Sequence, residues 1–259
     1  MNLTTAEIGG YIGTFMWPFV RIGAMFTIAP IFGSQMLPMR VKLLIAVTVT
    51  LVLIPVIPAV PNLDPLSPQG IFTLMQQFLI GFSMGFVLQL VMGAITMGGH
   101  SVAMGMGLGF ASMVDPQNGV QVPVLSQYFL ILTTLLFLSL NGHLIMIDVL
   151  AQSFHILPVG TSGLLAEGVW GLVQWGGQMF AGAVLIAMPV MISLMVVNIG
   201  FGVMMRAAPQ LNIFAVGFPI TMLIGFVLIM VTLPTVADLI QRLFDEAFNF
   251  LRLMLQGGT

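Results

Sequence analysis

Ser162 and the three histidines are the residues of this sequence whose types are suited to catalysis or metal binding. Ser162 lies in Gly160-Thr161-Ser162-Gly163, and a GxSG motif at a helix start is typical of intramembrane serine proteases, where a histidine on a later helix activates the serine. His100, His143 and His155 all precede Ser162, so the chain offers no downstream base. We therefore interpret the motif as a Gly/Ser loop and predict no catalytic residue.

Neither a metal site nor a cofactor site is predicted. No histidine has a second His or a Glu at the i,i+4 spacing of a zinc-binding helix, and the chain has no cysteine. The glycines of Gly105–Gly109 lack the Gly-Lys-Ser/Thr sequence of a phosphate-binding loop. We expect no metal, no cofactor and no enzymatic activity.

Asp115 and Asp148 are the acids that could relay protons within an apolar chain, with Arg21 as a possible partner. Asp115 precedes Pro116 in the turn-like sequence Asp-Pro-Gln-Asn, which favours a structural role in that turn. The sequence contains no paired carboxylates at an obvious relay spacing, so proton relay is the weaker interpretation.

Composition places all these residues in a membrane protein. Only 5% of the 259 residues are charged, 59% are hydrophobic, and the mean hydropathy is +1.12. A soluble domain carries about 25% charged residues, so this chain has too little polar surface for one. A cytosolic enzyme, a nucleic-acid-binding protein and a disordered linker are excluded together.

The elements that position these residues are long apolar segments between sparse charges. A membrane-spanning helix needs about 20 apolar residues, and the segments lack the alternation of barrel strands. We predict an all-α integral membrane protein with about six long helices, interrupted by Pro and Gly, in one unit over 1–259. The expected helices are 7–32, 43–60, 71–97, 123–141, 169–200 and 212–234.

A C-terminal amphipathic helix is predicted over 235–256, with Thr235 as its N-cap. Its polar residues recur at helical spacing, so they form one stripe. The stripe suits either a membrane-interface helix or a helix that docks on a partner, and the sequence leaves both open. The candidate docking residues are Asp238, Arg242, Asp245, Glu246 and Arg252.

A Gly/Met-rich segment over 99–122 has two interpretations. Gly and Met can pack one helix tightly on its neighbours. They can also form a deformable plug that closes a pore, because Met packs adaptably and Gly permits unusual backbone torsions, but composition alone favours the packed helix. Arg21, inside an apolar segment, and Arg206 are predicted to form buried ion pairs, because an unpaired cation there is costly.

Several motifs in order along nearly the whole chain resemble the R-subunit family of the bacterial flagellar type III export gate. They are Pro30–Pro38 followed by Arg40 and Lys42, Gly107–Pro116, Asn141-Gly142-His143, Ser153-Phe154 with Leu157-Pro158, and Arg206–Phe214 leading to Gly217-Phe218-Pro219.

The resemblance implies a structural and gating subunit that carries unfolded rod, hook and filament proteins across the inner membrane at the flagellar basal body. It implies a hetero-oligomer with P and Q subunits, contact with the substrate-switching B subunit, and helices in tilted hairpins. It also implies that the matching loop is a pore plug. The predicted plug residues are Met104, Gly105, Met106, Gly107, Gly109, Phe110, Met113, Asp115, Pro116 and Gln117.

Two rival functions remain open at this point. A small-solute secondary transporter would also contain broken helices, but it predicts paired interruptions in two related halves, and we find none. The homologous injectisome gate subunit is the nearest relative with which this chain can be confused.

Overall fold

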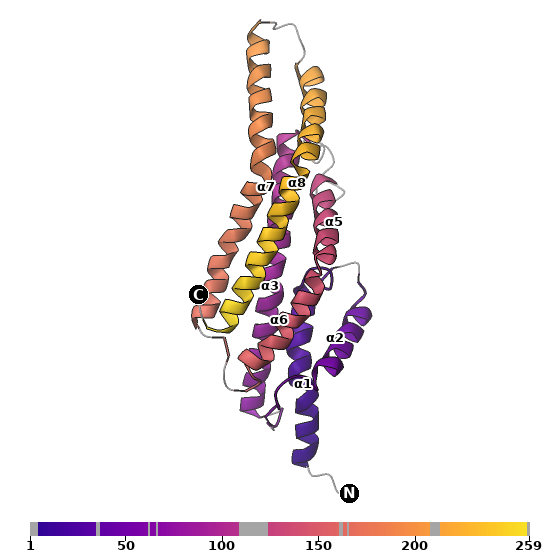
Figure 1. The fold of residues 1–259 in the computed structure, drawn as a ribbon, viewed down its shortest axis with the longest axis vertical. Coiled ribbons are helices and arrows are strands. Elements are labelled where there is room, and N and C mark those ends of the chain that lie inside the picture. The colour runs from indigo at the N-terminus through magenta and orange to yellow at the C-terminus, as the bar shows by residue number, and fades with distance from the viewer. Residues whose placement is uncertain are drawn as a thin grey trace. The chain divides into compact units, whose positions relative to one another are not determined.

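The computed structural model describes residues 5–34, 37–61, 63–65, 67–108, 124–160, 163–164, 166–207 and 213–257, and the side chains of these except in 5–12 and 213–216. Within these ranges all regular secondary structure is helical, as predicted (Figure 1). The helices are α1 (Thr5–Ile28), α2 (Met39–Leu53), α3 (Pro68–Gly105), α5 (Val124–Ser139), α6 (Gly142–Ile156), α7 (Ala166–Ala207) and α8 (Ile213–Leu255).

Several of these helices are long and apolar enough to cross a membrane. Among the described residues, α3, α7 and the Gly217–Leu255 part of α8 satisfy this condition individually, and α5 and α6 satisfy it together as one broken span. By contrast, α2 has 15 residues, which is short of the roughly 20 that a span requires. The chain is therefore an all-α integral membrane protein.

The C-terminal helix differs from the prediction. We expected a break before 235, but α8 continues through both Pro219 and Pro234, and Thr235 lies inside it. Proline is tolerated inside helices of membrane proteins because neighbouring groups satisfy the carbonyls that it frees. The buried face also runs past Pro234 without a change of side, since Ile229, Val236 and Ile240 are all buried.

The contacts divide the chain into two compact units. Unit 1 comprises Met1–Leu90, Leu138–Gly176 and Phe244–Thr259, and unit 2 comprises Val91–Phe137 and Gly177–Leu243. Helices α3, α7 and α8 each contribute residues to both units. Our expectation of one unit over the whole chain stays a prediction.

In unit 1, α1 packs closely against the first half of α3. A Cβ atom added at Gly81 would collide with the backbone carbonyl oxygen of Arg21, and one added at Gly85 would lie 2.7 Å from the carbonyl oxygen of Met25. Two glycines four residues apart thus let the two helix backbones touch. This is the close approach that a GxxxG spacing predicts.

A strained turn returns the chain from α1 to α2, which packs beside α1 (Figure 1). Ile31 has a φ of 70°, which is rare for a β-branched residue. The Phe32 amide donates to the Pro30 carbonyl oxygen at 2.8 Å, which closes a three-residue turn around Ile31. The Phe32 ring stacks on Phe26 with centroids 4.7 Å apart, and this contact helps to hold the turn.

Unit 2 is built on the hairpin of α7 and α8, with the end of α3 and most of α5 packed in the same unit. Glycine again sets the spacing between helices, because a Cβ added at Gly98 would lie 2.9 Å from the Ile186 side chain and one at Gly99 would lie 3.0 Å from the Ser126 Cα.

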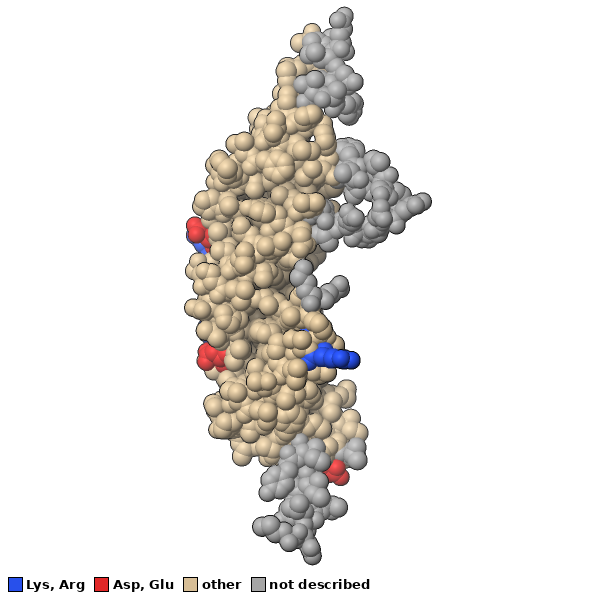
Figure 2. Space-filling model, turned by 90° about the vertical axis from the view of Figure 1, so that its right-hand side faces the viewer, with Lys and Arg blue, Asp and Glu red and all other residues tan. Residues whose placement is uncertain are grey.

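Charged side chains are almost absent from the face of the molecule in Figure 2, where coloured atoms occupy only a few small, separate places.

Candidate functional site

The end of α3 is a Schellman cap, and it lies where the predicted plug begins. The Leu108 amide donates to the Ala103 carbonyl oxygen at 2.9 Å, and the Gly107 amide donates to that of Met104 at 3.0 Å. Gly107 adopts a φ of 81°, which glycine tolerates and side chains disfavour. The glycine at 107 therefore ends the helix and fixes the direction in which the chain leaves it.

Two close contacts hold this cap inside unit 2. A Cβ added at Gly107 would lie 2.7 Å from the Phe218 ring of α8. One added at Gly105 would lie 2.5 Å from the Met191 sulfur of α7. We call residues 104–108, these two partners and Gly225 of α8 the Gly–Met anchor.

Met106 occupies the centre of the anchor and is 0% exposed. A Cβ added at Gly225 of α8 would lie 2.6 Å from the Met106 Cγ, so the side chain fills the space that this glycine leaves. The plug role that we predicted for Met106 stays a prediction. Met104, in contrast, is 53% exposed and remains available for contacts outside unit 2.

The other predicted plug residues lie outside the described part of the chain. These are Gly109, Phe110, Met113, Asp115, Pro116 and Gln117. The structure thus shows how the segment is attached on its N-terminal side, and their role as a plug stays a prediction.

A buried arginine joins three helices in unit 1. Arg21 of α1 is 0% exposed, and its Nε donates to Gln77 Oε1 of α3 at 2.8 Å. Its Nη1 donates to the Ser153 carbonyl oxygen at 2.9 Å and to Ser153 Oγ at 3.1 Å. Its Nη2 donates to the Leu157 carbonyl oxygen at 2.8 Å. We call these residues the Arg21 joint.

Two further features stabilise the charge of Arg21. Ser153 and Leu157 belong to the last turn and C-cap of α6, where the helix dipole is negative and favours a cation. The guanidinium also lies over the Phe154 ring, 4.2 Å from its centroid, which is a favourable cation–π distance.

The ion pairing that we predicted for the two arginines differs from what the structure shows. Among the described residues, the acceptors around Arg21 are uncharged oxygens: backbone carbonyls at a helix end and two neutral side chains take the place of an acid. Arg206, in the last turn of α7, is exposed within this chain and not buried. Its predicted burial would therefore require another molecule.

The polar stripe of α8 faces outward as predicted. Asp238, Arg242, Asp245 and Glu246 are exposed and Arg252 is half-buried. The opposite face of the same segment is buried, which keeps the stripe in one orientation; its buried residues include Ile240, Leu243, Ala247, Leu251 and Met254.

The structure does not assemble the remaining polar candidates into a catalytic arrangement within the described residues. Asp148 is exposed and accepts a hydrogen bond from Gln152 Nε2 at 2.7 Å, one turn along α6. The described residues contain no group of three His, Asp or Glu side chains able to hold a metal ion. Ser162 and Asp115 lie outside the described residues.

Sequence reasoning did not identify which residues contact each other at the Arg21 joint and at the Gly–Met anchor. The motifs Ser153-Phe154, Leu157-Pro158 and Phe218-Pro219 stood out as family features, but nothing in them shows which residues they contact. Gln77 and Met191 carried no signal, because a Gln or Met in an apolar helix has no local mark of its partner.

Comparison with known proteins identifies the protein family to which this chain belongs. Residues 12–247 match the family described as bacterial export proteins, family 1. The chain belongs to this family.

Individual relatives are similar over nearly their whole length. The chain is 38% identical over 252 residues to the flagellar biosynthetic protein FliR of Pectobacterium carotovorum subsp. carotovorum, covering 97% of this chain and 96% of that protein. It is 34% identical over 251 residues to the FliR of Escherichia coli strain K12, with the same coverage of 97% and 96%. It is 28% identical over 256 residues to the FliR of Aquifex aeolicus, covering 99% and 98%.

Proposed function

We propose that this chain is a structural and gating subunit of the flagellar type III protein export channel. Its similarity to FliR proteins over 92% or more of its length in several bacteria carries this proposal. The substrates would be unfolded rod, hook and filament proteins that cross the inner membrane at the flagellar basal body. The long apolar helices support the membrane location.

The gating role rests on the segment that follows the Gly–Met anchor. The buried Met106 and the cap at Gly107 attach one end of this segment to unit 2. Beyond the cap, the sequence supplies Phe110 and Met113 among glycines. An apolar constriction excludes water and ions until it is displaced, so such a segment suits a plug that yields to a passing chain.

The partners would be the P, Q and B subunits of the export gate, and the chain itself would have no enzymatic activity. Exposure of Asp238, Arg242, Asp245 and Glu246 on one stripe supports a docking role for the end of α8. Because the opposite face of α8 is buried, truncation would damage unit 1. Asp245→Lys with Glu246→Lys is the cleaner test of docking, and normal assembly and secretion in that variant would contradict the docking role.

The plug is tested by removing 109–117, which leaves the Schellman cap at 103–108 in place. Cells that carry the deletion should leak ions while the gate still assembles. Phe110→Asp should also raise the leak, because a charge favours wetting of an apolar constriction. Ser162→Ala is the control and should change neither leak nor export. An unchanged leak in both plug variants would rule out the seal.

Native mass spectrometry of the complex in mild detergent tests the assembly. A heteromeric particle several times heavier than the 27.9 kDa chain, with other small membrane proteins, is the expected result. A monomer or homodimer in repeated gentle extractions would favour a small-solute transporter.

A further inference from the structure

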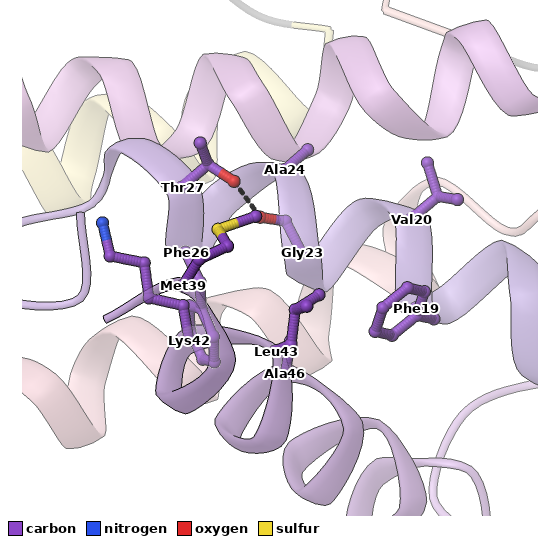
Figure 3. Close-up of a pocket in the computed structure, with 10 residues that line it drawn as sticks. All are labelled: Phe19, Val20, Gly23, Ala24, Phe26, Thr27, Met39, Lys42, Leu43 and Ala46. Carbon is purple, nitrogen blue, oxygen red and sulfur yellow. Dashed lines mark hydrogen bonds between the residues drawn. The ribbon is translucent and has the colours of Figure 1, made fainter. Parts of the chain in front are cut away.

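A groove with a volume of about 200 Å³ lies between α1 and α2, inside unit 1 (Figure 3). Apolar side chains from both helices line it, including Phe19, Leu43 and Ala46. The hydroxyl of Thr27 also borders the groove, but it donates to the Gly23 carbonyl oxygen at 2.8 Å within α1. The interior is therefore suited to a hydrocarbon ligand.

Open space next to Gly23 shows that part of the groove is unfilled by the protein. A Cβ added at Gly23 would meet no atom within 4 Å, although this glycine lies on a helix that packs against α2. In contrast, Gly81 and Gly85 bring α3 against the backbone of α1. Gly23 thus borders a space that no described part of the protein fills.

Positive charge lies at one end of this groove. Lys42 borders it, and Figure 3 shows its ammonium extending from α2 away from Ala46. Lys42 Nζ donates to the Gly33 carbonyl oxygen at 3.1 Å, and an ammonium has three donors, so two have no acceptor among the described residues. Arg40 is exposed in the same first turn, which contains no acidic residue.

The outer surface of α2 continues the apolar character of the groove. Leu44, Leu51 and Val52 are each more than half exposed. The helix is too short to span a membrane, and both of its cations lie in its first turn. A short apolar helix with cations at one end matches the depth profile of one membrane leaflet, where headgroups lie at the surface and acyl chains below.

We propose that the groove between α1 and α2 binds an anionic phospholipid, with an acyl chain along Phe19, Gly23 and Leu43 and the phosphate at Lys42. Arg40, at the same end of α2, adds to the positive potential at the headgroup. The strained turn around Ile31 places the Gly33 carbonyl that holds Lys42 at the mouth of the groove. This proposal does not depend on the export function.

The test uses the full-length chain, purified in mild detergent with any subunits that remain bound, and titrated with phosphatidylglycerol, phosphatidylcholine or inorganic phosphate. Bound lipid is counted by native mass spectrometry. The wild-type chain should bind phosphatidylglycerol in preference to phosphatidylcholine and bind inorganic phosphate alone only weakly. Lys42→Gln should weaken phosphatidylglycerol binding about fivefold, and Arg40→Gln with Lys42→Gln about 25-fold. Phosphatidylcholine binding should not change.

Matched controls distinguish lipid binding in the groove from general effects of losing a charge or adding a bulky side chain. Gly23→Leu fills the groove and should abolish binding of both lipids. Gly176→Leu introduces the same side chain at another helical glycine with open space around its Cβ and should leave binding intact. Arg242→Gln removes an exposed cation from α8 and should also leave binding intact.

Equal binding of the two lipids, or equal loss in Lys42→Gln and Arg242→Gln, would overturn the proposal. A photo-reactive benzophenone side chain in place of Leu43 distinguishes the occupant in cells. A phospholipid adduct is expected, whereas a protein adduct would show that a partner subunit covers the groove and would also overturn the proposal.

Discussion

The Arg21 joint and the Gly–Met anchor both lock helices together, but with opposite chemistry. At the Arg21 joint a buried guanidinium is held by hydrogen bonds of 2.8–3.1 Å to oxygens of α3 and α6. At the Gly–Met anchor the contacts of Met106 and Met191 are made by flexible side chains against glycines. Directional bonds fix one geometry, whereas methionine contacts adapt when a neighbour moves.

The difference indicates which part of the molecule can change shape. Movement of α6 relative to α1 would leave a buried cation without acceptors, which is costly. Movement next to Met106 exchanges one set of apolar contacts for another. We therefore expect the Arg21 joint to stay rigid and the surroundings of the Gly–Met anchor to yield, which four sets of substitutions test.

Arg21→Leu should have the largest effect. It leaves the buried Gln77 side-chain oxygen and the part-buried Leu157 carbonyl oxygen without their Arg21 donor, while the Ser153 carbonyl oxygen keeps only the Leu157 amide. The free energy of unfolding should fall by about 3–5 kcal/mol. Thermal unfolding in detergent measures the loss, with Arg252→Leu as a control of similar chemistry on a half-buried site. Equal melting temperatures in the two variants would contradict the role of the joint.

Gly81→Ala should be the next most damaging. The new Cβ would lie against the backbone of Arg21, which cannot rotate away as a side chain can, so the helices must separate. We expect a loss of about 1–3 kcal/mol. Gly176→Ala, with nothing near its Cβ, should be neutral or slightly stabilising by the same unfolding assay.

Gly107→Ala and Gly225→Ala should differ from each other although both lie in the Gly–Met anchor. At Gly107 the positive φ disfavours any side chain, and the Phe218 ring also blocks it, so the expected loss is about 1–2 kcal/mol. At Gly225 the obstacle is the flexible Met106 side chain, so we expect less than about 1 kcal/mol. Equal losses, measured by urea titration in detergent, would show that the anchor does not adapt.

Asp238→Asn should have the smallest effect, within about 0.5 kcal/mol. Asp238 and Arg242 are exposed one turn apart on α8. Removing the charge weakens at most a surface attraction. The measurement is the melting temperature at low and high salt, and a large salt-dependent shift would contradict this expectation.

Helix content and the membrane class were predictable because they depend on composition and on local apolar length. That α3 would approach another helix closely was also predictable, since Gly81 and Gly85 stand four residues apart, but the spacing did not identify α1 as its partner. In contrast, the continuity of α8 through Pro234 was not, because it depends on burial of the same face on both sides of the proline. Local sequence shows the proline but not its tertiary surroundings.

Sequence predicted the individual residues of the two sites where the residue type itself was unusual, but not the residues that they contact. Arg21 was predictable as a buried residue, because a cation in an apolar segment requires polar partners. The expected partner was an acid, and that expectation was wrong. Two of the acceptors are carbonyl oxygens at the end of α6, which have no sequence signal because every residue has a carbonyl, and the others are the neutral side chains of Gln77 and Ser153. Met106 likewise stood out by composition, while its partner Gly225 was one glycine among 29.

The Arg21 joint also constrains the order in which the chain can fold during synthesis. The Ser153 carbonyl that binds Arg21 lies 132 residues later in the chain, and the Leu157 carbonyl lies 136 residues later. Since translation proceeds from the N-terminus, α1 exists well before the end of α6 is made. During that interval the guanidinium must remain at a wet surface or with a temporary partner, so the Arg21 joint closes only after α6 is complete.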